Sequence, residues 1–377
     1  MPKGENNGDF IYWLGTDIST KILTHLDDPS DLVRVSSVSR LWLQFVVENG
    51  ICTQLCFKKF PEISIAARGI EANNLLEPLK HGVGNSTEWE FLERKHRIYS
   101  FLAQGLSPVV SKSCILQSIS ASSTDNYPTE SICRTLVPGD RFESVPSYWS
   151  SDGKSDPTFP ETLLYKLVAK LCVVTEIHIQ PFQASFQFGH PIYSCKAIRF
   201  RIGHLRNLVE LKDEFLYNSN IPHSLEDDRF VWTYVSPEFP MAQENVLQKF
   251  ELPEPALCVG GFLLVELLGR VQKQEIDGLY YICIAHVQVM GRPLLQPFDV
   301  QMHDHSGKCS LKYFTAEVYS ESSPKFPIAE VGESSRLRTI TSRFMSVIGW
   351  QRDRLPITPS RSPSVAGGDE PENERHD

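Results

Sequence analysis

The spacing of apolar residues changes once along this chain, near residue 105. Before that point apolar side chains recur every three or four residues, the period of one face of an α-helix. From about 106 to 350 they alternate in short runs separated by Gly, Pro, Ser and Asp, which is typical of strands and turns. This order of patterns predicts a multidomain α + β protein, with helices first and an antiparallel β-sandwich or jelly roll after them.

Length and composition set broad limits on the protein. The 377 residues, 41% hydrophobic and 22% charged, suffice for two or three globular domains. A net charge of −9 repels a phosphate backbone, so we expect no nucleic-acid partner. The longest apolar stretch, residues 262–268, is too short to cross a membrane, and residues 1–9 lack a secretory signal. Nine cysteines without paired spacing then indicate reduced thiols and an intracellular protein of the cytoplasm, the nucleus or both.

Start signals in the first region predict three helices within residues 9–57. Thr16 is expected to cap the first helix, and Asp28, followed by Pro29 at the first helical position, to cap the second. One of the serines 36–37 is expected to begin the third. These helices carry more large apolar side chains than three short helices bury among themselves, and each one left in water forgoes about 1.5–3 kcal/mol. The surplus packs either on a partner protein or on the rest of the chain, and spacing leaves both open.

The order of these residues resembles the F-box of plant-type F-box proteins. The segments DPSDLVRV (28–35) and VSRLW (38–42) are its most recognisable pieces, and residues 55–57 match its usual tail. The resemblance implies a helical domain that binds a Skp-type adaptor, which in turn binds a cullin. The positions that it assigns to adaptor contact or to packing within the F-box are Leu14, Ile18, Ile22, Leu26, Pro29, Leu32, Val38 and Trp42.

Two positions depart from the F-box pattern. Gly15 stands where the family has Pro after Leu14, and Cys52 stands where it commonly has Trp. The first change removes a rigid start and the second removes a large apolar anchor. We therefore expect weaker adaptor binding than is usual for the family.

The strand pattern is clearest in three segments of the second region. Residues 171–180 and 197–202 alternate, and residues 281–289 are expected to place Cys283, Ala285, Val287 and Val289 on one apolar face. Before the last segment, residues 277–278 (Asp-Gly) form a hairpin-turn signal. Several such strands without intervening helices predict the sandwich.

Residues 118–203 resemble a discoidin-type, galactose-binding-like jelly roll. The resemblance is carried by SISASSTDNYPTESI (118–132), SYWSSDGKSDP (147–157), VVTEIHIQPF (173–182) and PIYSCKAIRFRIG (191–203). In that family the Tyr-Trp-Ser-Ser element belongs to the scaffold, and ligands meet loops at one end of the barrel. Related domains bind carbohydrate, lipid or protein, so the fold leaves the ligand open.

Few side chains indicate chemistry. G-x-S-x-G and H-E-x-x-H motifs are absent, so no catalytic residue and no cofactor are predicted. His303, His305 and Cys309 lack the second spaced pair of a metal site and indicate a polar loop, so no metal is expected. Across strands, Glu176 and His178 could pair with the arginines at 199 and 201, as surface stabilisation.

The domain plan that follows has five segments. They are a disordered N-terminus (1–8), an F-box (9–57), a helical linker (58–105), a discoidin-like β-sandwich that binds the target (106–350) and a disordered tail (351–377).

The leading hypothesis is a non-catalytic substrate receptor. It would bridge a Skp-type adaptor, and through it a cullin, to an unknown target protein with or without glycans. A lectin-like or protein-binding scaffold that acts without ubiquitination is the alternative, and an enzyme of unrecognised type is a third.

Overall fold

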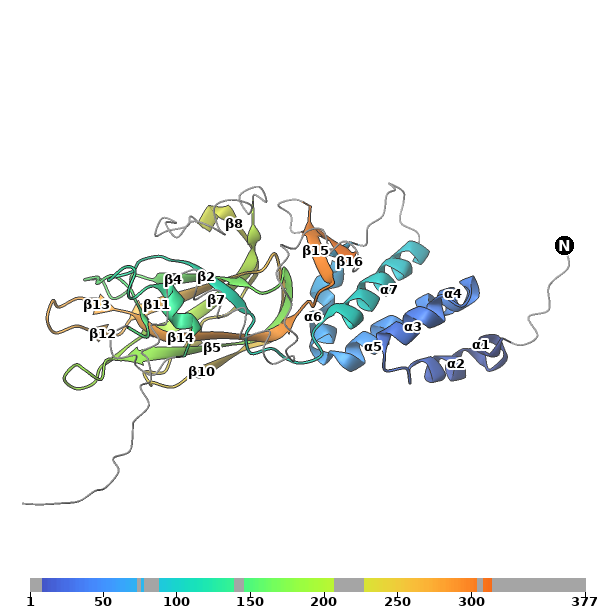
Figure 1. Ribbon diagram of the computed structural model, residues 1–377, viewed down its shortest axis with the longest axis horizontal. Helices are drawn as coiled ribbons and strands as arrows, with labels where there is room; N and C mark the ends of the chain where they lie inside the picture. The colour runs from blue at the N-terminus through green and yellow to red at the C-terminus, as the bar shows by residue number, and fades with distance from the viewer. Residues whose placement is uncertain are drawn as a thin grey trace, which may run out of the picture. The chain divides into compact units, whose positions relative to one another are not determined.

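The computed structural model of the protein describes residues 9–72, 76–77, 88–138, 146–206, 227–303 and 308–313. The predicted disordered ends, 1–8 and 351–377, lie outside them. The described helices precede the sandwich strands along the chain (Figure 1). They are α1 (Phe10–Trp13), α2 (Gly15–Leu23), α3 (Pro29–Ser36), α4 (Arg40–Glu48), α5 (Ile51–Lys59), α6 (Pro61–Ala72) and α7 (Glu88–Gly105).

The three helices expected in the F-box are α2, α3 and α4, and the cap predicted for α3 is confirmed. Asp28 is extended and its carboxylate accepts from the N–H of Ser30 at 2.8 Å, with Pro29 at the first helical position. The cap predicted for α2 is wrong, because α2 begins at Gly15 and Thr16 lies within its first turn. Gly15 has a φ of +77°, a conformation that favours glycine, and it turns the chain from α1 into α2.

Helix α4 begins later than its predicted start at residues 36–37. Ser39 is the cap, and the N–H of Trp42 donates to its hydroxyl at 3.2 Å. Ser36 still belongs to α3, where its hydroxyl donates to the carbonyl of Leu32 at 2.9 Å. A serine bonded back along its own helix in this way is not available to cap the next one.

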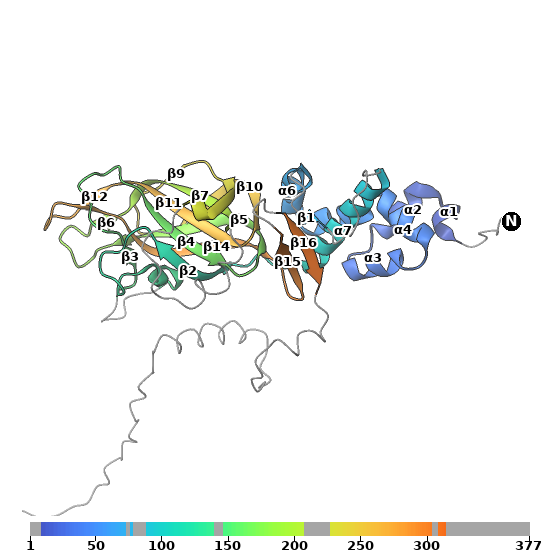
Figure 2. The ribbon, with the colours of Figure 1, turned by 90° about the horizontal axis from the view of Figure 1, so that it is seen from above.

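Two antiparallel sheets pack face to face as a sandwich of the jelly-roll kind (Figure 2). The strands of the first sheet are β3 (Trp149–Ser150), β5 (Leu171–Gln183), β6 (Ile192–Tyr193), β10 (Gln248–Val259) and β14 (Cys283–Pro293). Those of the second are β2 (Ile115–Ala121), β4 (Glu161–Leu167), β7 (Cys195–Leu205), β8 (Phe230–Val235), β9 (Phe239–Pro240) and β11 (Phe262–Arg270).

The strand order is β10-β5-β14-β3 in the first sheet, with β6 paired to β5. It is β2-β4-β11-β7-β8 in the second, with β9 paired to β7. The predicted alternation in β7 is confirmed, because Ile198, Phe200 and Ile202 are fully buried between the sheets. Trp149 is also fully buried, and its indole N–H donates to the carbonyl of Ser123 at 3.1 Å.

Strand β5 changes phase halfway along its length. Cys172 and Val174 are buried in the sandwich core, whereas beyond them the residues on that side are Ile177 and Ile179. The pairing of β5 with both neighbours skips Thr175, so that residue forms a bulge. The single alternation predicted for this segment is therefore wrong at the bulge and correct on each side of it.

Strand β14 also contains a register irregularity, between Ile284 and His286. Ile284 lies in the sandwich core, and after the irregularity Val287 and Val289 follow on that side. The prediction that residues 283, 285, 287 and 289 share one apolar face is therefore wrong at Cys283, which packs in a different cluster, and correct at Val287 and Val289.

A third, smaller sheet lies outside the sandwich. It contains β1 (Leu76–Glu77), β15 (Phe298–Met302) and β16 (Cys309–Tyr313), in the order β1-β16-β15. Strand β1 comes from the predicted linker and pairs in parallel with β16. Strands β15 and β16 thus belong to a different sheet from the sandwich predicted over 106–350, and residues 314–350 lie outside the described residues.

Helices α5, α6 and α7 pack on the sandwich and on the third sheet through one shared cluster, here called the basal core. Its fully buried members come from all three parts, and Phe60, Leu102, Val173 and Cys309 are examples. The complete set is Cys56, Phe60, Ile63, Ala67, Ile98, Tyr99, Leu102, Ala103, Leu106, Leu171, Val173, Val259, Leu294, Val300, Cys309 and Leu311.

The predicted hairpin turn is confirmed. It joins β12 (Gln272–Lys273) to β13 (Tyr280–Tyr281), and Gly278 has a φ of +73°. The carboxylate of Asp277 accepts from the N–H of Leu279 at 2.9 Å.

Candidate functional site

The predicted adaptor-binding positions differ in exposure. Ile18, Ile22 and Val38 are 53%, 42% and 61% exposed. Only exposed side chains meet a partner directly, so these three are the candidates for contact. The remaining positions are buried (Pro29, Leu32) or half-buried (Leu14, Leu26, Trp42).

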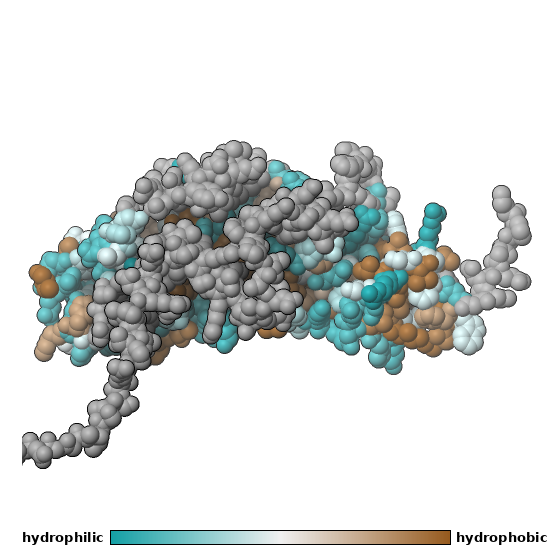
Figure 3. All heavy atoms as spheres, viewed as in Figure 1, coloured by the Kyte–Doolittle hydropathy of each residue, from teal (hydrophilic) through white to brown (hydrophobic). Residues whose placement is uncertain are grey.

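Further apolar side chains are exposed around these three. Ile18 and Ile22 lie one turn apart on α2 and so share one face of that helix. Trp13 of α1 is 84% exposed, the largest exposure of an apolar side chain in the described N-terminal helices. Figure 3 shows hydrophobic residues gathered over this region. The set, here called the N-terminal apolar face, is Trp13, Ile18, Ile22, Val33, Val38 and Leu41.

Trp42 supports this face from within. Its indole N–H donates to the carboxylate of Asp9, at 3.0 and 2.8 Å from the two oxygens. Its ring meets the edge of the Phe10 ring, with 5.1 Å between centroids. These contacts fix α1, and with it Trp13, against α4.

The two departures from the F-box pattern have structural explanations. Proline fixes φ near −65°, which is incompatible with the +77° of Gly15. Cys52 is 3% exposed and packs in the core of the N-terminal helices. Neither residue therefore presents an apolar side chain on the exposed face.

The opposite end of strand β5 from the basal core leads into a group of loops, here called the loop end. Tyr148 and Phe182 stack there, with 3.7 Å between centroids, and the hydroxyl of Tyr148 donates to Glu130 at 2.9 Å. Phe188, in the loop between β5 and β6, is 96% exposed, and Ile276, in the β12–β13 turn, is 90% exposed. Exposed apolar residues at loop tips mark an interaction surface when they occur together.

Carboxylates accompany these aromatic rings. Burial raises the pKa of Asp125, and the negative charges of Asp152 and Asp277 raise it further. Asp277 in turn accepts from the hydroxyl of Tyr281 at 2.5 Å. The loop end therefore combines exposed aromatic surface with negative charge.

A buried ion pair holds the loops in place. The side chains of Arg270 and Glu161 are both fully buried and form a salt bridge. Arg270 also donates to the carbonyls of Asp152 and Tyr280, each at 2.7 Å, and to the hydroxyl of Ser151 at 3.1 Å. One guanidinium thus satisfies backbone groups from the β3–β4 loop and from β13.

The predicted pairing of Glu176 and His178 with the arginines of β7 is wrong. Strands β5 and β7 belong to different sheets, so their side chains are not cross-strand neighbours. Glu176 instead pairs with His178 at 3.0 Å and with Lys249 at 3.1 Å. The arginines at 199 and 201 pair with Glu266, at 2.5 and 2.7 Å.

The His, Cys, Asp and Glu side chains of the described residues do not gather as metal ligands. No group of three or more His, Cys, Asp or Glu among them could hold a metal ion. Cys309 is buried in β16, and Asp304 and His305 lie outside the described residues. All nine thiols are free, and every one except Cys133 is buried. Burial raises the pKa of the Cys195 thiol to about 12, so it stays protonated at neutral pH.

No helix in the described part of the chain has the length and apolar character needed to cross a membrane.

Solved structures similar to this chain include two sugar-binding proteins. One is the family 32 CBM from Clostridium perfringens NanJ in complex with galactose, at 14% identity over 48% of this chain and 99% of that one, with a TM-score of 0.29. Another is a fucolectin from striped bass (Morone saxatilis) serum, at 13% identity over 50% of each chain, also with a TM-score of 0.29.

The N-terminal helices and most of the remaining sequence have closer relatives. Residues 16–58 match the family described as F-box-like, a range that covers α3, α4 and most of α2 and α5. The chain is 50% identical over 312 residues to the F-box protein At4g00755 of Arabidopsis thaliana, and 81% of each protein is covered. This chain therefore belongs to the F-box protein family.

Proposed function

We propose that the chain is the substrate-recognition subunit of an SCF-type ubiquitin ligase. Its N-terminal apolar face binds a Skp-type adaptor, and through it a cullin, while the loop end of the sandwich holds a target protein. The chain performs no chemistry and needs no cofactor; it contributes proximity and orientation to a reaction catalysed elsewhere. The proposal places the protein inside the cell, in the cytoplasm, the nucleus or both.

The exposure of the N-terminal apolar face is the observation that carries this proposal. Ile18, Ile22 and Val38 remain in water although the N-terminal helices have their own core of residues such as Leu32 and Val46. Burial of each exposed aliphatic side chain on a partner gains about 1.5–3 kcal/mol. A protein partner recovers this free energy, and the F-box match favours a Skp-type adaptor as that partner.

The loop end supports the second half of the proposal. The exposed ring of Phe188 and the exposed Ile276 supply apolar contact area, while Asp125 and its neighbours supply charge. Loops held by a rigid scaffold are common binding elements. The salt bridge of Arg270 with Glu161 provides such a scaffold here.

Adaptor binding is tested by replacing Ile18 and Ile22 with Asp in the full chain. Each Ile→Asp loses its apolar burial and places a charge in the interface, so affinity for a purified Skp-type adaptor should fall at least about 100-fold. Isothermal titration calorimetry measures the affinity. Thr16→Asp is the matched control, because it adds the same side chain to α2 at about 160° around the helix from Ile18 and should bind normally.

Target binding is tested by the reciprocal variant, in which Phe186 and Phe188 of the β5–β6 loop, 63% and 96% exposed, become Asp. It should retain adaptor and cullin in pulldowns and should lose proteins that proximity labelling with the wild-type chain identifies. Wild-type chain that purifies from cell extract without adaptor and cullin would overturn the proposal.

A lectin-like scaffold without ubiquitination is the second candidate, favoured by one observation. The half-buried rings of Tyr148 and Phe182 stack at the loop end and provide an apolar face that also suits a sugar. A glycan array with the full chain separates the candidates. Strong glycan binding by a chain that captures no adaptor would favour the lectin.

A further inference from the structure

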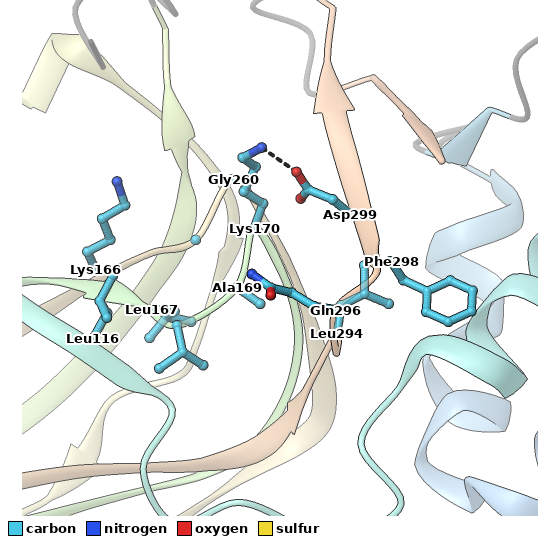
Figure 4. A pocket seen from close by; sticks show the side chains of 12 residues that line it. Leu116, Lys166, Leu167, Ala169, Lys170, Gly260, Leu294, Gln296, Phe298 and Asp299 are labelled. Carbon is cyan, nitrogen blue, oxygen red and sulfur yellow. Dashed lines mark hydrogen bonds and ion pairs between the residues drawn. The ribbon is translucent and has the colours of Figure 1, made fainter. Parts of the chain in front are cut away.

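A cavity lies at the basal end of the sandwich, away from the N-terminal apolar face and the loop end. It has a volume of about 250 Å³. The turn between β4 and β5, the turn between β10 and β11, and the segment that leads into β15 form its walls (Figure 4). This volume is below the roughly 300–1,000 Å³ of pockets for drug-sized ligands, so it suits a smaller molecule.

Two lysines line this cavity, and only one of them is neutralised. Lys170 forms a salt bridge with Asp299 at 2.7 Å. Asp299 also accepts from the N–H of Val300 at 2.8 Å, so the carboxylate is engaged on both oxygens. In Figure 4 the side chains of Lys166 and Lys170 extend in the same direction, with Gly260 between them.

Lys166 has no carboxylate partner among the described residues. Its ammonium lies 5.7 Å from the centroid of the Phe262 ring, a weaker cation–π contact. Burial lowers the pKa of Lys166, and the positive charge of Lys170 lowers it further. A half-buried cation in this position favours an anion, because an anion would return the free energy lost on desolvation.

The rest of the cavity wall is apolar with one amide. Leu116 and Val168 line the cavity with side chains 43% and 41% exposed, whereas Leu167 and Leu294 are buried in the cores behind it. Gln296 places a side-chain amide in the wall, with two donors and one acceptor. The lining charges are two lysines and one aspartate, so one positive charge remains for a ligand.

We propose that this cavity binds a small organic carboxylate, with its charged group on Lys166 and its apolar body against the exposed side chains of Leu116 and Val168. A monoanion matches the single uncompensated charge, whereas a phosphate dianion would leave one negative charge unpaired beside Asp299. The ligand would contact the sandwich turns and the β15 segment together. It would therefore stabilise the contact between the sandwich and the third sheet, independently of adaptor and target binding.

Calorimetric titration of the full chain with hexanoate and with benzoate tests the proposal. Hexanamide and benzamide are the matched neutral probes and should bind at least tenfold more weakly. Lys166→Gln should weaken hexanoate binding at least tenfold, and Lys166→Arg should restore most of it. Lys273→Gln, which removes a lysine at the β12–β13 hairpin, is the control and should leave binding unchanged.

The pH dependence supplies a second readout. An anion that prefers charged Lys166 raises its pKa on binding, so hexanoate affinity falls as pH rises through the lowered pKa of Lys166. The Lys166→Arg variant should lack this fall. Three outcomes would each overturn the proposal: no binding of either carboxylate at millimolar concentration, equal binding of the amides, or competition by inorganic phosphate as strong as that by hexanoate.

Discussion

At the scale of single residues, the side chain of Arg270 holds the loops of the sandwich in place. It is fully buried, and burial lowers the pKa of its guanidinium, opposed by the charge of Glu161. Glu161 also accepts from the hydroxyl of Ser123 at 2.8 Å. A buried pair of this kind stabilises the fold little relative to apolar residues, yet the loss of one partner leaves the other charge buried and unpaired.

Arg270→Met should therefore destabilise the protein by about 3–5 kcal/mol. The double variant Arg270→Met with Glu161→Gln should recover part of that loss, because no unpaired charge remains. Urea denaturation of the full chains measures both free energies of unfolding. Arg34→Met is the control: Arg34 is 76% exposed in its pair with Asp31, so the change should cost less than about 1 kcal/mol.

At the scale of elements, β5 has both faces covered near the basal core. Val174 packs in the sandwich core, and its neighbour Val173 packs in the basal core. After the bulge at Thr175 the strand has one buried face, with Ile177 and Ile179 inward. The bulge thus joins a two-sided stretch of strand to a one-sided stretch.

Val173→Ala and Val174→Ala should each cost about 1.5–2.5 kcal/mol, from the transfer of two methyl groups and the cavity left behind. If the strand were buried on one face only, one of these two substitutions would hardly change the free energy of unfolding. Chemical denaturation distinguishes the two results. Lys249→Ala, at a side chain 47% exposed on the neighbouring β10, should change stability by less than about 0.5 kcal/mol.

The helices, strands and turns were predicted better from the sequence than the contacts between them. Helices α2, α3 and α4 follow from apolar spacing, and the Asp28 cap and the 277–278 turn follow from local chemistry. The bulge at Thr175 could not be predicted from the residues around it, because the alternation of apolar residues does not indicate which faces of the strand other elements cover. The pairing of Glu176 failed for a related reason: sheet membership depends on contacts between distant segments.

The candidate site was predictable in part. The F-box pattern identified Ile18, Ile22 and Val38, which are exposed, but it also included Leu32, which is buried. The spacing of apolar residues along the sequence does not by itself distinguish exposed positions from buried ones. Trp13 was missed because α1 has only four residues, although an isolated Trp beside a predicted helix was a signal that could have been used. The cavity beside Lys166 was not predictable, because its walls come from four distant segments.

At the scale of the whole molecule, the basal core makes the helical part and the sandwich interdependent. Phe60 of the helical part is fully buried, and the guanidinium of Arg292, at the end of β14, lies 5.2 Å from its ring centroid. Arg292 also forms a salt bridge with Glu62 of α6 and donates to the carbonyl of Pro108 at 2.7 Å. Such contacts predict one unfolding transition rather than two.

Phe60→Ala should lower the free energy of unfolding by about 3–5 kcal/mol. Far-ultraviolet circular dichroism of the helices and near-ultraviolet signal from buried aromatic residues of the sandwich should shift together to the same lower midpoint. Leu41→Ala, at a residue 37% exposed on α4, is the control and should shift neither signal appreciably. Early loss of the helical signal alone would contradict this interdependence.

Strand β5 begins at Leu171 in the basal core and ends at Gln183 among the loops. Its 13 residues span about 40 Å. The packed side chains of the basal core hold the first residues of this strand, and the strand runs from there to the loop end without a break. On the proposed function, the distance from ligase scaffold to cargo is then built into the protein rather than left to a flexible tether. The lysines of the target that lie within reach of the ubiquitin-charged enzyme at this distance are then modified, and the lysines outside that reach are not.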